Sequence, residues 1–117
     1  MNVLEVARIL SGKLMTAADN AGSCEVRGAY CSDLLSDVMA NSNESDLWIT
    51  LQRHVNIVAV AHLKGLSGVV IVNGREPEAE TTARAEAERI PIIVTALSAF
   101  EAAGILYGLG IRGRGSA

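Results

Sequence analysis

The chain has 117 residues, of which 50% are hydrophobic and 20% charged, with 10 Lys and Arg against 13 Asp and Glu and a formal net charge of −3. It is too short for two cores of ordinary size, so we expect one domain over residues 1–117 with a core over about 2–110 and a flexible tail over 111–117. The acidic balance excludes the broad basic surface used to bind nucleic acid or an anionic membrane, and we expect neither partner.

Two features of the sequence bear on location. The opening residues MNVLEVARILSGKL carry Glu5 and Arg8 within an apolar pattern and lack the features of a secretory signal. The most apolar stretch, 55–63, is far shorter than the ~20 apolar residues of a membrane-spanning helix. We therefore expect a cytoplasmic protein.

The first half of the chain predicts a helix, two strands and a second helix. Apolar residues at helical spacing predict a short amphipathic helix over 2–10, and a brief strand over 13–16 follows. Alternation over 24–31 predicts a longer strand, in which Cys24 and Cys31 are expected as buried thiols. Ser32-Asp33 are the expected cap of a helix through Leu34, Leu35, Val38 and Met39.

The second half alternates strands and helices. Apolar runs at 46–51, 68–73 and 91–95 predict strands, and the run at 68–73 has the pattern of a strand covered on both faces. Residues 55–64 fit either a helix or a buried strand, and a helix there makes the alternation consistent. Further helices are predicted from Pro77 to Glu88 and from Ser98, the latter with Phe100, Ala103 and Tyr107 on one face.

This alternation with short connections predicts an α/β fold, a three-layer sandwich with a mostly parallel central sheet. The apolar residues exceed what one sheet face needs, and such a surplus is commonly buried between subunits, so we expect a homodimer. The residues that suggest the surplus are Leu34, Leu35, Val38, Met39 and Trp48.

Residues 28–110 are similar to the DRTGG domain family. The likeness lies in an order of features: a strand and Ser32-Asp33, Asp46 before a strand, an apolar helix, a strand running into Asn73-Gly74, then Pro91-Ile92 and Thr95 before a helix that starts near Ser98-Ala99-Phe100-Glu101. The family's common Thr-Gly-Gly step appears here as Asn73-Gly74-Arg75. The resemblance implies a fold like the N-terminal domain of the HPr serine kinase/phosphorylase, without its kinase domain. It also implies a regulatory or binding module that acts with a partner enzyme.

Two sequence patterns that bind nucleotides in other proteins do not predict such a site here. Residues 108–113 match GxGxxG, but this dinucleotide fingerprint works between a strand and a helix, and here it follows a helix. Glycines that end a helix are the alternative. A phosphate-binding GxxxxGK[ST] loop does not occur, and the two Cys and two His lack metal-site spacing, so neither a metal nor another cofactor is expected.

Polar residues follow three predicted strands and form the candidate binding site. Ligands of open parallel sheets bind outside the carboxyl ends of the strands, so these residues are expected to converge on one rim. Arg75 would engage an anionic small molecule such as a nucleotide, and Gly74 would let it approach the backbone. The alternative is that they are caps and turn residues. The candidate residues are Gln52, His54 and Asn56 after the first strand, Asn73, Gly74 and Arg75 after the second, and Thr95 and Ser98 after the third.

The sequence is compatible with three classes of function. We expect a non-catalytic regulatory module that senses a small ligand or binds a partner protein. The alternatives are a small enzyme that uses the rim around His54, Asn73 and Arg75, or a structural subunit of a larger cytoplasmic complex. No nucleophile–base pair or paired carboxylates mark a catalytic centre in the sequence, which favours the module and predicts that the chain is not an enzyme.

Overall fold

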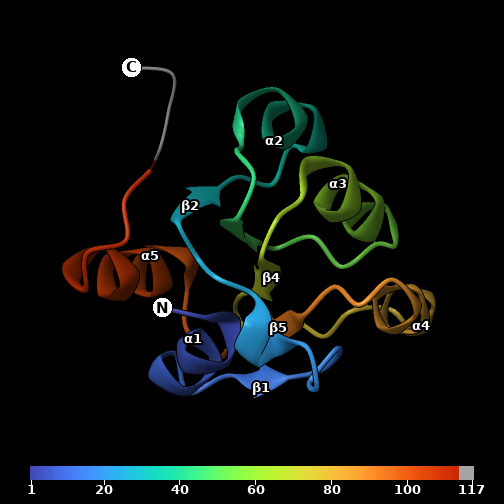
Figure 1. Ribbon diagram of the computed structural model, residues 1–117, viewed down its shortest axis with the longest axis horizontal. Helices are drawn as coiled ribbons and strands as arrows, with labels where there is room; N and C mark the ends of the chain where they lie inside the picture. The colour runs from blue at the N-terminus through green and yellow to red at the C-terminus, as the bar shows by residue number, and fades with distance from the viewer. Residues whose placement is uncertain (114–117) are drawn as a thin grey trace.

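The computed structural model describes residues 1–113 and contains a five-stranded sheet in the order β1-β5-β4-β3-β2 (Figure 1). The strands are β1 (Lys13–Leu14), β2 (Gly28–Cys31), β3 (Asp46–Thr50), β4 (Gly68–Ile71) and β5 (Ile92–Val94). The helices are α1 (Val3–Ile9), α2 (Leu35–Asn41), α3 (Asn56–Lys64), α4 (Ala79–Ala87) and α5 (Ala99–Gly108), with a 3-10 helix, η1, over Ala21–Ser23.

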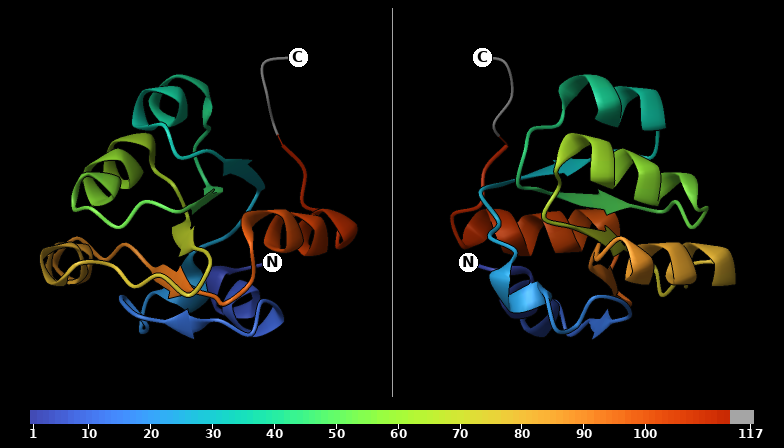
Figure 2. Two further views of the ribbon diagram at one scale, coloured as in Figure 1. Left: turned by 180° about the vertical axis from the view of Figure 1, so that it is seen from behind. Right: turned by 45° about the vertical axis from the view of Figure 1, so that its right-hand side comes forward.

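Strands β2 to β5 are parallel neighbours in chain order, and β1 pairs antiparallel with β5. Each crossover therefore steps in the same direction across the sheet, and right-handed crossovers place α2, α3 and α4 on one face. The other face is covered by α1 and α5 (Figure 2). The three layers and the mostly parallel sheet agree with the fold class predicted from the sequence.

The core lies on both faces of the sheet. Val70 of β4 packs with α1 and α5, whereas Val69 and Ile71 pack with α2, α3 and α4, as the two-residue period of a strand requires. All four residues of β4 are buried, which confirms a strand covered on both faces, but the strand ends at Ile71 and not at Asn73 as predicted. Within residues 1–113, no helix is long and apolar enough to span a membrane.

Several helix ends follow the sequence closely. Asn2 and Glu5 form a reciprocal capping box at the start of α1. Helix α3 ends at Gly65, whose φ of 64° suits a residue without a Cβ. Residues 55–64 are thus a helix, as the alternation required. Ser98 caps α5 by accepting a hydrogen bond from the Glu101 N–H at 3.2 Å.

The predicted strand over 24–31 is wrong in its first half. Pairing with β3 begins only at Gly28, and Cys24 follows η1 instead. Cys24 is half-buried and Cys31 exposed, so the expectation of two buried thiols is also wrong. A strand needs a partner along its whole length, and the segment before Gly28 bonds to the N-terminal residues: the Val26 N–H donates to the Met1 carbonyl at 2.8 Å.

The predicted starts of α2 and α4 differ in part from the structure. Helix α2 begins at Leu35, and of the predicted Ser32-Asp33 cap only Ser32 contacts its start: Ser32 Oγ accepts a hydrogen bond from the Leu34 N–H at 3.2 Å. The Asp33 carboxylate instead accepts hydrogen bonds from Thr50 Oγ1 at 2.9 Å and from the Leu51 N–H at 2.7 Å. Helix α4 begins at Ala79, with Pro77 ahead of it.

Burial corrects two further expectations. Ile111, assigned to the flexible tail, is 8% exposed and packs in the cluster that contains the buried residues of α1 and α5. Residues 114–117 of the predicted tail lie outside the described residues. Val38 and Trp48 are fully buried within the subunit, so they supply none of the surplus apolar surface, whereas Leu34 and Met39 are exposed.

Candidate functional site

The carboxyl edge of the sheet has a switch point between β4 and β5. The chain leaves β4 for α4 on one face and leaves β5 for α5 on the other. Adjacent parallel strands whose connections part in this way leave an opening between them, where ligands of open α/β sheets bind. Asn73, Gly74 and Arg75 follow β4, and Thr95 and Ser98 follow β5.

Two backbone hydrogen bonds join the loops at this switch point. The Asn73 N–H donates to the Leu97 carbonyl and the Gly74 N–H to the Thr95 carbonyl, both at 2.8 Å. Asn73 and Gly74 adopt positive φ values of 60° and 66°, so the chain turns sharply after β4. The structure thus brings these residues together, but the N–H groups of Asn73 and Gly74 already have acceptors and are not free to bind an anion that approaches the backbone.

The remaining groups at the switch point differ in whether they are free to contact a ligand. The Thr95 side chain is 1% exposed, and its hydroxyl donates to the Leu10 carbonyl at 2.9 Å, so it supports the loop from inside. Ser98 is occupied as the cap of α5. Among residues 1–113, the backbone N–H groups of Ala99 and Phe100 and the exposed side chain of Arg75 have no acceptor. These three groups are positive elements of the β4–β5 switch point, whereas Arg53, the cation after β3, donates to the Glu76 carbonyl.

The residues that follow β3 lie at the same edge but are held by other contacts. Gln52 Nε2 donates to the Asp33 carbonyl at 2.8 Å, which turns it toward the loop after β2. His54 Nδ1 accepts from the Asn56 N–H at 3.2 Å and so caps α3. The Arg53 carbonyl accepts from the Glu78 N–H at 3.2 Å, which ties the loop after β3 to the loop after β4. The predicted rim therefore divides into two groups, the residues after β3 and the residues after β4 and β5.

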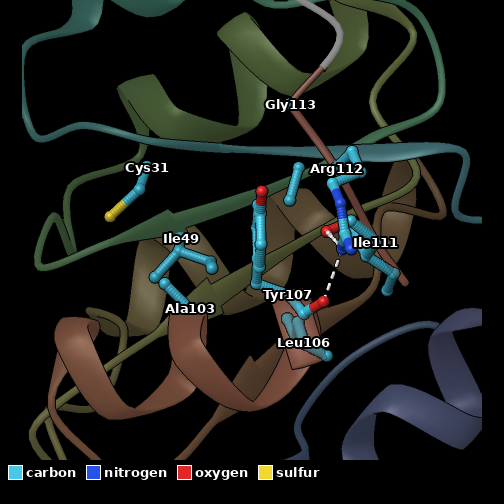
Figure 3. Close-up of a pocket in the computed structure, with 9 residues that line it drawn as sticks. Cys31, Ile49, Ala103, Leu106, Tyr107, Ile111, Arg112 and Gly113 are labelled. Carbon is cyan, nitrogen blue, oxygen red and sulfur yellow. Dashed lines mark hydrogen bonds between the residues drawn. The ribbon is translucent and has the colours of Figure 1, made fainter. Parts of the chain in front are cut away.

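A cavity of about 120 Å³, which the sequence analysis missed, lies between α5 and the ends of β2 and β3 (Figure 3). The Arg112 guanidinium lies 3.8 Å from the centre of the Tyr107 ring and donates to the Tyr107 carbonyl. The only sequence signal was an apolar Ile111 and a cation after the glycines that end α5. The cavity is lined by Ala29, Cys31, Ile49, Ala103, Leu106, Tyr107, Ile111, Arg112 and Gly113.

The Cys31 thiol at the margin of this cavity is a poor nucleophile. Partial desolvation, and to a lesser degree the negative charge of Asp33, raise the pKa of the thiol. It therefore stays protonated near neutral pH, where the reactive thiolate is scarce. Among the described residues, no three His, Cys, Asp or Glu side chains are grouped to hold a metal ion.

Comparison with known proteins identifies the family. A model of the DRTGG domain matches residues 5–109, nearly the whole described chain. The chain belongs to the DRTGG domain family. A comparison with curated proteins gives no significant match.

A solved structure supports the fold of this DRTGG domain. It contains the CBS and DRTGG domains of the regulatory region of Clostridium perfringens pyrophosphatase, complexed with the activator diadenosine tetraphosphate. The TM-score is 0.72 at 18% sequence identity, over 89% of this chain and 45% of that chain. The present chain thus spans less than half the length of that relative.

Proposed function

We propose that this DRTGG domain is a non-catalytic regulatory module that binds an anionic small ligand of the nucleotide class at the β4–β5 switch point. The observation that carries the proposal is the group of unpaired positive elements there: the Arg75 side chain and the first N–H groups of α5. A helix N-terminus and a guanidinium both favour the oxygens of a phosphate.

The proposed site is centred on Arg75, with Asn73, Gly74, Thr95 and Ser98 shaping the loops around it. Thr95 and Ser98 act there by holding the backbone, through the Leu10 carbonyl and the Glu101 N–H. The remaining rim residues, on the β3 side of the same edge, are proposed to flank the ligand: Gln52, His54 and Asn56.

Family membership and the solved relative support the regulatory part of the proposal. A nucleotide activates the pyrophosphatase whose regulatory region contains a DRTGG domain. By analogy we propose that the present domain acts on a partner enzyme in the cytoplasm. The likeness to the N-terminal domain of the HPr serine kinase/phosphorylase, implied by the order of sequence features, belongs to the same proposal.

The geometry gives less support to an enzyme. His54 uses Nδ1 to cap α3, and no hydrogen bond joins it to a nucleophile or a carboxylate in residues 1–113. His62 Nδ1 lies 3.5 Å from Glu88 Oε1, where the C-terminal ends of α3 and α4 meet, and so it does not belong to the candidate site. General base catalysis needs a base within reach of its nucleophile, and this arrangement does not supply one.

A thermal-shift titration tests the proposal. ATP and diadenosine tetraphosphate are the probes, with inorganic phosphate as a control for non-specific anion binding. A ligand that binds only the folded state raises Tm as its concentration rises. We expect one of the nucleotides to stabilise the wild type, and Arg75→Ala to abolish that response without lowering the Tm of the free protein.

Two further variants locate the site. Arg8→Ala removes another exposed arginine, on α1, and should respond like the wild type. Arg112→Ala removes the cation at the cavity beneath α5 and should also respond normally. Loss of the response in Arg112→Ala alone would move the ligand to the cavity. No response of the wild type to either nucleotide would contradict the nucleotide proposal.

A further inference from the structure

Helix α5 has an apolar outer surface that no other helix or strand of residues 1–113 covers. Its sequence, AFEAAGILYG, contains one charged residue, Glu101. Ala102 and Leu106 are buried against the sheet, whereas Phe100 on the opposite side is 85% exposed, and Tyr107, which borders the cavity between α5 and the strands, is 60% exposed. A helix that is apolar all round is ordinarily covered on every side. Figure 1 shows α5 at the margin of the molecule, with no other helix beyond it.

Two glycines make this outer surface flat. Gly104 and Gly108 are four residues apart, which places them on one side of the helix with Phe100. A Cβ added at either glycine would meet no atom within 4 Å, so packing inside the subunit does not require them. Glycine within a helix costs about 1 kcal/mol relative to alanine. We call the side formed by Phe100, Gly104 and Gly108, with Tyr107 at its margin, the α5 strip.

The charges next to the α5 strip are arranged to complement a second copy of themselves. Glu101 lies in the first turn of α5, and Arg112 follows its end, with its guanidinium stacked on Tyr107. Neither side chain forms an ion pair within residues 1–113. If two α5 helices pack antiparallel across a two-fold axis between Gly104 and Gly108, the start of each lies beside the end of the other. Each Glu101 then approaches the Arg112 of the second copy.

We propose that the α5 strip is the contact surface of a two-fold symmetric homodimer. Its outward apolar side chains fill the space on either side of the glycines, where the two helix backbones approach closely. Two symmetric Glu101–Arg112 pairs set the antiparallel direction. Such a contact is self-complementary, as closed two-fold assembly requires. The inference is independent of the proposed ligand site, and it uses a different surface from the one around Leu34 and Met39 that the sequence analysis suggested.

Sedimentation equilibrium of the full chain at micromolar concentrations tests the proposal. The wild type should be a dimer. Gly104→Gln places a long polar side chain on the α5 strip, where the subunit has room for it, and should give a folded monomer. Gly22→Gln is the matched control, because Gly22 is also exposed and its added Cβ would meet only Leu4, at 4.0 Å. This control should remain a dimer.

Charge reversal tests the direction of packing. Glu101→Arg and Arg112→Glu should each weaken the dimer, and the double variant should restore it. A wild type that is monomeric throughout the concentration range would overturn the proposal. A folded Gly104→Gln dimer would overturn it as well. A dimer that loses stability in both single reversals without recovery in the double variant would refute the antiparallel arrangement. A nucleotide that still raises the Tm of monomeric Gly104→Gln would show that the ligand site does not need the dimer. The two proposals can therefore fail separately.

Discussion

Replacing Ile71 by Asp tests whether β4 is the covered centre of the fold. Ile71 is 0% exposed and lies at the end of β4, between Thr50 of β3 and Val94 of β5. Its side chain packs in the cluster beneath α2, α3 and α4. An aspartate there loses most of the buried side chain and also places a carboxylate where neither water nor a cation is available.

The magnitude follows from two contributions. Truncating a buried isoleucine to alanine costs about 2–5 kcal/mol. An unpaired carboxylate in an apolar site adds a penalty of several kcal/mol. A domain of this kind is stable by roughly 5–15 kcal/mol. The combined loss is therefore comparable to the whole stability, and we expect Ile71→Asp to be unfolded.

Urea denaturation followed by circular dichroism gives a graded test. Ile71→Val should lower the free energy of unfolding by about 0.5–1.5 kcal/mol. Leu63→Asp is the matched control: Leu63 is 71% exposed on α3, and its replacement should change the free energy of unfolding by at most about 0.5 kcal/mol. An Ile71→Asp variant with the wild-type midpoint would refute the central, two-sided burial of β4.

Three other predictions concern buried hydrogen bonds, pH and catalysis. Thr16→Val leaves one N–H and one C=O of the backbone near β5 without the hydroxyl that pairs them, so the free energy of unfolding should fall by about 1–3 kcal/mol, measured in urea; an unchanged value would show that the hydroxyl is dispensable. Hydrogen bonds from Ser32 and Tyr30 lower the pKa of Asp37, so this carboxylate stabilises the fold above its unfolded pKa of 3.8 and the contribution is lost as pH falls through the lower folded value. Tyr30→Phe should raise the pKa of Asp37 in an NMR titration. An unchanged pKa of Asp37 in this variant would show that the Tyr30 hydroxyl does not lower it. The purified protein should not hydrolyse nucleotides, and turnover that disappears in His54→Ala would instead assign it an enzyme activity.

The sequence predicted a secondary-structure element correctly where the pattern of one segment was consistent with the elements before and after it. Residues 55–64 have no clear helical face, but parallel strands on either side require a crossover, and α3 supplies it. Residues 24–27 alternate like a strand, yet alternation does not reveal whether a partner strand is present. Ile111 stands alone after the glycines that end α5, and a single apolar residue carries no periodic signal of burial.

The candidate site was predictable in position and less so in its chemistry. Parallel strands bring Asn73, Arg75 and Thr95 to one edge whatever their side chains do. Their hydrogen bonds depend on three-dimensional contacts that the sequence does not display. The Thr95 hydroxyl bonds to Leu10, 85 residues away in the chain, and the Asn73 N–H bonds to the facing loop. The same limit hid the cavity between β2, β3 and α5, which combines segments from both halves of the chain.

The central claim is that a nucleotide binds at the β4–β5 switch point, and an amide ¹H–¹⁵N NMR titration of the full chain tests it most directly. With diadenosine tetraphosphate or ATP as the probe, we predict saturable shifts at the backbone amides of Arg75, Ala99 and Phe100. The same titration of Arg75→Ala should leave these amides unmoved while the spectrum stays folded. Shifts confined to the cavity around Tyr107 and Arg112, or no saturable shifts with either nucleotide, would contradict the claim.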